Sequence, residues 1–146
     1  MEILKMTMDD YEAVYALWLK TAGIGLTDLD DGREGIEQFL KRNPNTCFVA
    51  REGERLVGVI LGGNDGRRGA LYHAAVEESE RGKGIGTALT RACLEALRQE
   101  GVTRVTLAAY GHNESGNDYW ERRGFVLRDD LMYRTKDLVQ METIKK

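Results

Sequence analysis

A glycine-rich segment that runs directly into an amphipathic helix most limits the folds open to this chain. The segment Arg81–Gly86 reads Arg-Gly-Lys-Gly-Ile-Gly. Apolar residues then recur at helical spacing, and they are Ile85, Ala88, Leu89, Ala92, Cys93, Ala96 and Leu97. Arg98 and Gly101 are residue types that commonly end a helix. The sequence therefore predicts a tight turn followed by a long helix with one buried face.

Such a turn brings backbone N–H groups close to anions. The first N–H groups of a helix have no partner within the helix, and they lie at the positive end of its dipole. Glycine has no Cβ to keep phosphate oxygens away from the backbone. The turn before this helix is therefore interpreted as a phosphate-binding loop, with a tight turn that binds no ligand as the alternative.

Two better-known phosphate motifs do not match this loop. A P-loop requires Gly-Lys followed by Ser or Thr, whereas Lys83 is followed by Gly84. A dinucleotide fingerprint requires G-x-G-x-x-G, and Gly86 comes one residue too early for it. The segment Val102–Leu107 also lacks the carboxylate that this fingerprint places about 20 residues downstream. The loop belongs to neither class.

The pattern that fits is R-x-x-G-x-G, formed by Arg81, Gly84 and Gly86 after a predicted strand that ends at Val76. It resembles the acetyl-CoA-binding signature of the GNAT superfamily of N-acetyltransferases, in the form of a small bacterial-type stand-alone domain. The resemblance implies acetyl-CoA as cosubstrate. The residues implied to hold its pyrophosphate, mainly through backbone N–H groups, are Arg81, Gly82, Lys83, Gly84, Ile85, Gly86 and Thr87.

The resemblance also assigns a role to the strand before the loop. In the family, the backbone at this position pairs with the pantetheine arm and can polarise the thioester carbonyl as an oxyanion hole does. The residues at this position are Ala74, Ala75 and Val76.

A second motif lies between Asn113 and Phe125. It is similar to the family pattern N-x(6)-Y-x-x-x-G-F, with Asn113, Gly124 and Phe125 at the expected spacing. The tyrosine position holds Trp120, and Tyr119 comes one residue early. The resemblance implies that Asn113 contacts the amides of the pantetheine arm, whereas the alternative is a residue that begins the next helix.

The replacement at Trp120 affects the expected chemistry of the leaving group. In the resembling enzymes the tyrosine hydroxyl can protonate the departing thiolate, and an indole N–H can only donate a hydrogen bond. Tyr119 lies about 100° around the helix from Trp120. Both are retained as catalytic candidates, with Tyr133 as another hydroxyl, and Trp120 reads equally well as a packed residue. A missing general acid costs about 10²-fold to 10⁴-fold, and we expect the lower end because a thiol leaves readily.

The base that takes the proton of the acceptor amine stays open. In the family it commonly lies on the strand before the glycine loop. Counting back in twos from Val76 puts Ala74 and Tyr72 on one face and His73 on the other. Tyr72 is then the better-placed candidate, and His73 reads as a core histidine unless the strand is bulged. His112 is a further candidate.

The predicted elements make an α/β fold of one domain, residues 1–146. Their order is β-α-α-β-β-β-α-β-α-β-β, which resembles the GNAT fold nearly from end to end. The family fold implies a mixed, mostly antiparallel sheet with a central parallel pair and about four flanking helices. The parallel pair consists of the strands at 70–76 and 103–109, and two short strands at 125–127 and 131–134 end the chain.

Two charged segments point to different acceptors. The predicted loop between the first two helices carries carboxylates suited to a cationic amine, or it is simply solvated; they are Asp28, Asp30 and Asp31, with Glu34 and Glu37 beyond. Arg67 and Arg68, in the turn before the strand at 70–76, would suit an anionic acceptor or the 3′-phosphate of the adenosine.

The composition narrows the class of protein. A net charge of −3 argues against nucleic acid as a partner. No apolar run approaches the ~20 residues of a membrane span, and no secretory segment is recognisable, so we expect a cytoplasmic protein. Cys47 and Cys93 lie in apolar surroundings and are interpreted as reduced core residues. No cluster of metal ligands is visible, and we expect a monomer or a homodimer.

These observations predict an acetyl-CoA-dependent N-acetyltransferase in which a primary amine attacks the thioester directly. The acceptor is expected to be a small-molecule or peptide amine. Three alternatives remain: an N-terminal protein or peptide acetyltransferase, a non-catalytic acyl-CoA-binding domain, and a nucleotide-binding module that prefers ATP or NAD.

Overall fold

One mixed sheet runs through the centre of the molecule, which a computed structural model describes over residues 1–146. Its five strands lie in chain order and are β1 (Glu2–Lys5), β2 (Phe48–Glu52), β3 (Arg55–Asn64), β4 (Gly69–Val76) and β5 (Val105–Thr106). Neighbouring strands from β1 to β4 pair antiparallel, and β4 pairs parallel with β5. The predicted fold class, with its single parallel pair, is therefore confirmed.

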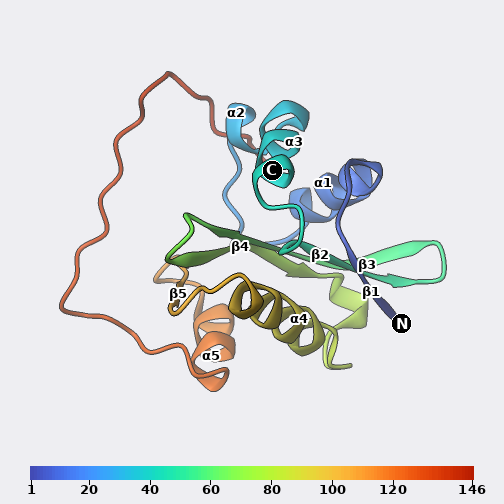
Figure 1. Cartoon of the computed structure of the whole chain (residues 1–146). Coiled ribbons are helices and arrows are strands. Elements are labelled where there is room, and N and C mark those ends of the chain that lie inside the picture. The colour runs from blue at the N-terminus through green and yellow to red at the C-terminus, as the bar shows by residue number, and fades with distance from the viewer.

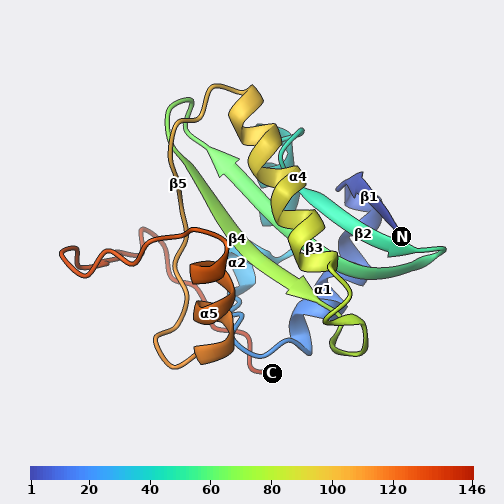
Figure 2. The same cartoon turned by 90° about the horizontal axis from the view of Figure 1, so that it is seen from below.

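Helices cover both faces of this sheet (Figure 1). One face carries α1 (Tyr11–Leu19), α2 (Asp28–Asp31) and α3 (Arg33–Arg42), and the other carries α4 (Ile85–Gln99) and α5 (Glu114–Arg122). Short 3-10 turns at Met8–Asp10 and Glu78–Glu80 precede α1 and the glycine loop. Figure 2 shows α4 lying over β3 and β4, which agrees with its contacts to these strands.

Each face of the sheet has its own apolar core. The apolar stripe predicted from the sequence is the buried face of α4, where Ile85, Leu89, Cys93 and Leu97 pack on the sheet. The opposite core joins α1 and α3 to the other side of β2 and β3. Strand β3 is buried along most of its length because it lies at the centre of the sheet with a helical layer on each side. Strand β4 therefore packs against an apolar core on each of its two faces.

A bulge interrupts β4 and overturns the predicted alternation of its side chains. Val59 pairs with Ala75 and Leu61 with Tyr72, so that Ile60 alone lies opposite two residues of β4. The extra residue reverses the alternation, because each added residue turns the following side chains to the other face. Tyr72 therefore does not share a face with Ala74, which packs on the α4 core while Ala75 packs on the α1 core.

Strand β5 is much shorter than the predicted strand at 103–109. Only Val105 and Thr106 pair with β4, opposite Gly69 and Ala70. Beyond this point the chain leaves the sheet towards α5, while β4 continues to Val76. The outer edge of β4 consequently has no neighbouring strand over its second half.

The two strands predicted at 125–127 and 131–134 do not form. Residues 126–140 run as an extended chain outside the sheet, and apolar side chains such as Leu127, Met132 and Tyr133 are exposed (Figure 1). The physical reason is the absence of a partner, since an apolar extended segment becomes a strand only where a neighbouring edge offers hydrogen bonds along its length. Beyond the extended chain, Thr143 forms an antiparallel bridge with Thr27.

Candidate functional site

The glycine loop presents a row of free backbone donors at the start of α4. Gly82 and Gly84 have φ angles of +81° and +86°, which only glycine adopts without strain, and Gly84 is the N-cap of the helix. None of the N–H groups of residues 82–87 donates to another backbone group, and Ala88 N–H, 3.0 Å from Gly84 O, is the first that does. A Cβ built at Gly82 or Gly84 would meet no atom within 4 Å, so the loop is open to the close approach of an anion.

The remaining predicted cofactor residues lie beside this loop. Strand β4 ends at Val76, and the Arg81 side chain donates from Nε to Val76 O over 3.1 Å, which joins the loop to the strand end. Thr87 in the first turn of α4 accepts from Nη2 of Arg123, the C-cap residue of α5, at 2.7 Å. The backbone of Ala74–Val76 has no neighbouring strand along its outer edge, while β3 pairs with its other edge. The loop and the free edge are thus continuous.

Asn113 begins α5, as the alternative interpretation of this residue proposed. Its Oδ1 accepts from Gly116 N–H at 3.1 Å, which caps the first turn of the helix. Its amide nitrogen faces the loop between α1 and α2, where a Cβ added to Gly23 would lie 2.7 Å from Asn113 Nδ2. The start of α5 and this loop therefore lie close together.

Tyr119 and Trp120 point to different parts of the structure. The Tyr119 hydroxyl lies 3.1 Å from Thr90 Oγ1, next to the first turn of α4, and the guanidinium of Arg123 covers its ring. Trp120 packs on the α4 core and against Phe125, with 5.3 Å between their ring centroids. Of the two candidates, Tyr119 is the one whose polar atom reaches α4 beside the glycine loop.

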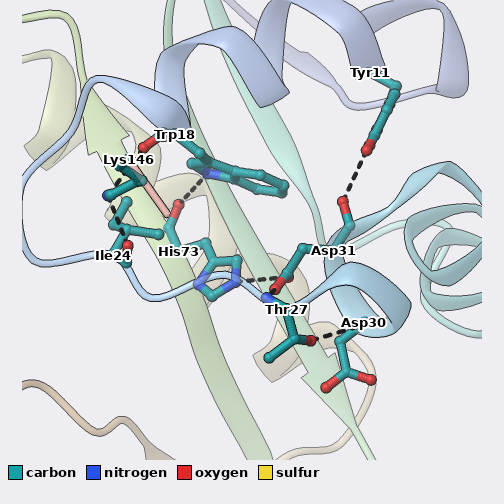
Figure 3. A network of polar contacts seen from close by, with 8 residues as sticks. All are labelled: Tyr11, Trp18, Ile24, Thr27, Asp30, Asp31, His73 and Lys146. Atoms are coloured by element: carbon teal, nitrogen blue, oxygen red, sulfur yellow. Dashed lines mark hydrogen bonds and ion pairs between the residues drawn. The ribbon is translucent and has the colours of Figure 1, made fainter. Parts of the chain in front are cut away.

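At the bulge of β4, His73 contacts residues of the helical layer that contains α1 and α2 (Figure 3). His73 has a φ of +51°, the only positive value outside glycine in the chain. Its Nε2 lies 2.8 Å from Asp31 Oδ1, and its carbonyl oxygen accepts from Trp18 Nε1 at 3.0 Å. The rings of Trp18 and His73 meet edge to face. A strained backbone that is held by several partners is typical of functional sites.

Asp31 is buried, with 6 % of its surface exposed, and each of its carboxylate oxygens has a hydrogen-bond partner. While Oδ1 contacts His73, Oδ2 accepts from Thr27 N–H at 2.8 Å, and the Asp31 carbonyl accepts from Tyr11 Oη at 2.8 Å. A buried carboxylate oriented by a backbone N–H is well suited to hold an imidazole in one orientation. Asp31 is therefore more than a solvated residue of an acidic loop.

Tyr72 stays a candidate base from the sequence, but its surroundings suit that role poorly. Its ring meets Phe39 of α3 edge to face. Burial, and to a lesser extent the nearby Tyr133, raises the pKa of its hydroxyl above the ordinary value. A phenol with a raised pKa stays protonated near neutral pH, and it therefore accepts a proton less readily.

The two charged segments lie in different places. Arg67 and Arg68 belong to the turn before β4, where their N–H groups both donate to Asp65. The glycine loop follows the other end of this strand, roughly 25 Å away for eight residues of strand. The arginine turn is thus remote from the anion-binding loop, whereas Asp31 of the acidic segment reaches β4.

Comparison with known proteins agrees with this geometry. The model of the family described as "Acetyltransferase (GNAT) family" matches residues 11–125. The chain belongs to the GNAT acetyltransferase family. "Acetyltransferase SG1711" of Sodalis glossinidius is 31% identical over 140 residues, which cover 96% of this chain and 97% of the relative. By membership of the family, this acetyltransferase is an acyltransferase.

Solved structures share the fold of this GNAT acetyltransferase. Ard1 from Thermoplasma volcanium superposes with a TM-score of 0.78 at 23% identity, covering 87% of this chain and 83% of that one. The PaiA N-acetyltransferase from Thermoplasma acidophilum, solved in complex with coenzyme A, has a TM-score of 0.76 at 18% identity, with 88% and 91% covered.

Three residues around this candidate site carry little signal in the sequence. From the sequence, Asp31 is only a carboxylate of an acidic loop, and Trp18 and Lys146 have no assigned role. Trp18 and Asp31 reach the bulge, and Lys146 reaches Trp18, through contacts between residues distant in the chain. The only available signal was a histidine on an apolar strand, which needs a polar partner when buried.

No group of three or more His, Cys, Asp or Glu side chains is arranged to hold a metal ion. No helix combines the length and the apolar character needed to cross a membrane.

Proposed function

We propose that this chain transfers the acetyl group of acetyl-CoA to a primary amine by direct attack of the amine on the thioester. The observation that carries the proposal is the row of unpaired N–H groups at residues 82–87, which continues from the uncovered edge of β4. Pyrophosphate suits the first element and a pantetheine amide suits the second. The coenzyme A bound to the Thermoplasma acidophilum neighbour supports this choice of substrate.

In the proposed reaction, the amine nitrogen forms a bond to the acetyl carbonyl carbon, and the bond from that carbon to sulfur breaks. The nitrogen loses a proton to a base, and the coenzyme A thiolate takes up a proton. Backbone N–H groups near Ala74–Val76 stabilise the negative charge that develops on the carbonyl oxygen.

His73 is proposed as the base. A carboxylate oxygen only accepts hydrogen bonds, so its contact with Asp31 places the imidazole proton on Nε2 and leaves Nδ1 to receive the amine proton. The Asp31 carboxylate also stabilises the imidazolium that results. His73 shares with Ala75 the face of the sheet that carries α1 and α2, and the bulge turns Tyr72 to that face as well.

A matched pair of glycine variants tests the cofactor site. Gly84 and Gly66 both have positive φ, at +86° and +90°, and open space around the missing Cβ, but Gly66 lies in the turn at the far end of β4. Alanine costs about 1–2 kcal/mol of strain at either position. Gly84→Ala should weaken acetyl-CoA binding at least about tenfold in calorimetry, since the loop must shift, and Gly66→Ala should bind normally.

Turnover with an amine, followed by release of the coenzyme A thiol, separates an enzyme from a binding domain. Saturable binding without turnover of any amine would favour the non-catalytic alternative. Failure of the wild-type chain to bind acetyl-CoA at about millimolar concentration would overturn the proposed function altogether.

A further inference from the structure

The segment Glu142–Lys146 lies along the loop between α1 and α2. Asp28 N–H donates to Glu142 O and Ile144 N–H donates to Leu26 O, each over 2.9 Å. Glu142 N–H also donates to Asp28 Oδ1 at 2.8 Å. With the antiparallel bridge of Thr143, these bonds bind the segment as a short added strand, a mode in which proteins commonly bind extended peptides.

The ammonium group of Lys146 ends this contact in a cluster of three carbonyl oxygens. Lys146 Nζ donates to Trp18 O at 3.2 Å, to Ile24 O at 2.7 Å and to Thr21 O. A primary ammonium group has three N–H donors, so the cluster uses all of them. Secondary and tertiary ammonium groups lack at least one of these donors, and the cluster therefore discriminates in favour of primary amines.

The carbonyl cluster is formed where α1 ends. Trp18 is in the last turn of that helix, where carbonyl groups carry the negative end of the helix dipole. The carbonyls of Thr21 and Ile24 accept from no backbone N–H group. A cation is therefore the partner that these oxygens favour. Partial burial lowers the pKa of Lys146 below its ordinary value.

This cluster borders the proposed reaction site. Trp18 belongs to both, because its carbonyl oxygen binds Lys146 while its indole N–H binds the carbonyl of His73 (Figure 3). The loop that carries Thr21 and Ile24 also packs against the start of α5, since Gly23 lies against Asn113. The ammonium group thus lies between the bulge of β4 and the helix that follows β5.

We propose that the carbonyls of Trp18, Thr21 and Ile24 form the recognition site for the ammonium group of the acceptor, and that Lys146 occupies this site within the same chain. The substrate class is a primary alkylamine with an unbranched chain, of the kind that a lysine side chain presents. The segment Glu142–Lys146 then competes with the acceptor, which binds only when Lys146 leaves. This inference rests on the proposed acetyl transfer.

In this proposal, binding of the amine and the chemical step depend on different groups of residues. The carbonyl cluster holds the acceptor as an ammonium ion, which must lose a proton before it attacks, and so the cluster determines the KM for the amine. The pair of His73 and Asp31 determines kcat. A variant that removes Lys146 from the cluster should therefore lower the KM for the amine and leave kcat unchanged.

The binding site is tested without acetyl-CoA, so that the result does not depend on the proposed reaction. In Lys146→Ala, the probe n-butylammonium replaces the missing side chain and should raise the Tm by a few degrees. Tetramethylammonium, which has no N–H donor, should not. The matched control is Lys145→Ala, because Lys145 is exposed and makes no hydrogen bond or ion pair, and n-butylammonium should leave its Tm unchanged.

A second variant covers the case in which Lys146→Ala does not fold. Lys146→Met keeps the length of the side chain and removes only its charge. The KM for a primary amine should fall about tenfold relative to wild type, as expected when a competing state is removed, and Lys145→Met should behave as wild type. Two acceptors, n-butylamine and a lysine-containing peptide, distinguish the source of the alkylamine. An equal fall for both assigns a free alkylamine, and a fall for the peptide alone assigns a lysine side chain.

Two results would overturn the inference. One is an equal response of the Lys146 and Lys145 variants to n-butylammonium, which would make the cluster only an anchor for the segment Glu142–Lys146. The other is selective binding of n-butylammonium with no change in the KM of either acceptor, which would place the ammonium site outside the path of the substrate. Loss of turnover in every variant would instead count against the proposed acetyl transfer, and not against the ammonium site.

Discussion

His73 Nε2 and Asp31 Oδ1 lie 2.8 Å apart, although one residue belongs to a strand and the other to a short helix on the face of the sheet. The contact depends on the placement of His73 on the face of the sheet that carries α1 and α2, the face it shares with Ala75. It also depends on a φ of +51° at His73, a conformation that costs about 1–3 kcal/mol in a residue other than glycine. The surrounding contacts with Trp18 and Asp31 offset this strain.

The first prediction concerns His73 as the base. Asparagine tolerates positive φ, so His73→Asn should keep the backbone of the bulge and remove the imidazole. We expect kcat to fall by about 10²-fold to 10⁴-fold with little change in acetyl-CoA binding, measured by steady-state kinetics and calorimetry. Tyr72→Phe is the control. If Tyr72→Phe lost the activity and His73→Asn kept it, the assignment from the sequence would be the right one.

The second prediction treats Asp31 as a positioning residue. Asp31→Asn should lower kcat because an amide cannot accept from both Thr27 N–H and His73 while leaving the imidazole in the same orientation. Asp30→Asn removes the same charge one residue away on an exposed side chain and should leave kcat unchanged. Comparison of the two kcat values separates a local role from the loss of a negative charge. Equal effects would point to the field of the loop rather than to the hydrogen bond.

The parts of this site that could be predicted from the sequence are those with local signals. The glycine loop and the stripe of α4 lie within one continuous segment, and their residue types correspond directly to turn geometry and helical spacing. Asn113 carried a similar signal, because asparagine favours the start of a helix. In these segments, the structure is determined by neighbours in the chain.

The bulge in β4 and the absence of the two predicted final strands could not be predicted from local signals in the sequence. A single extra residue in β4 reverses the direction of every following side chain, and the run Tyr72–Val76 contains no glycine or proline that would indicate it. The segments at 125–127 and 131–134 have the composition of strands, yet strand formation depends on an edge with which to pair. Both outcomes depend on contacts between distant residues, and so does the contact of His73 with Asp31.

The third prediction separates Tyr119 from Trp120. The Tyr119 hydroxyl lies beside the first turn of α4, so it is the better candidate to protonate the leaving thiolate. Tyr119→Phe should lower kcat by about 10²-fold, the lower end for general acid catalysis, with a small change in Tm. Trp120→Phe should lower the Tm through lost packing against Phe125 and keep kcat. The opposite pattern would assign the chemistry to the indole.

The fourth prediction concerns the two thiols. Burial, the largest cause in both residues, raises the pKa of Cys47 and of Cys93 from the ordinary 9.0 to about 12. At about pH 8, roughly one thiol in 10⁴ is then ionised in the folded chain, and only the thiolate reacts. A disulfide reagent should label neither residue in the native protein and both in urea. Rapid labelling of the native chain would show that the core opens on the time scale of the reaction.

The same pKa shifts set a direction for stability. Because the folded thiols keep their protons to higher pH than the unfolded ones, their contribution to the free energy of unfolding is complete below 9.0 and is lost as pH rises towards about 12. Urea unfolding at increasing pH should show this loss. In Cys47→Ala the loss should be smaller, since only the Cys93 thiol then remains to ionise on unfolding. An identical pH dependence in that variant would assign the effect to other groups, such as the buried Tyr11, whose pKa is also raised, mainly by burial.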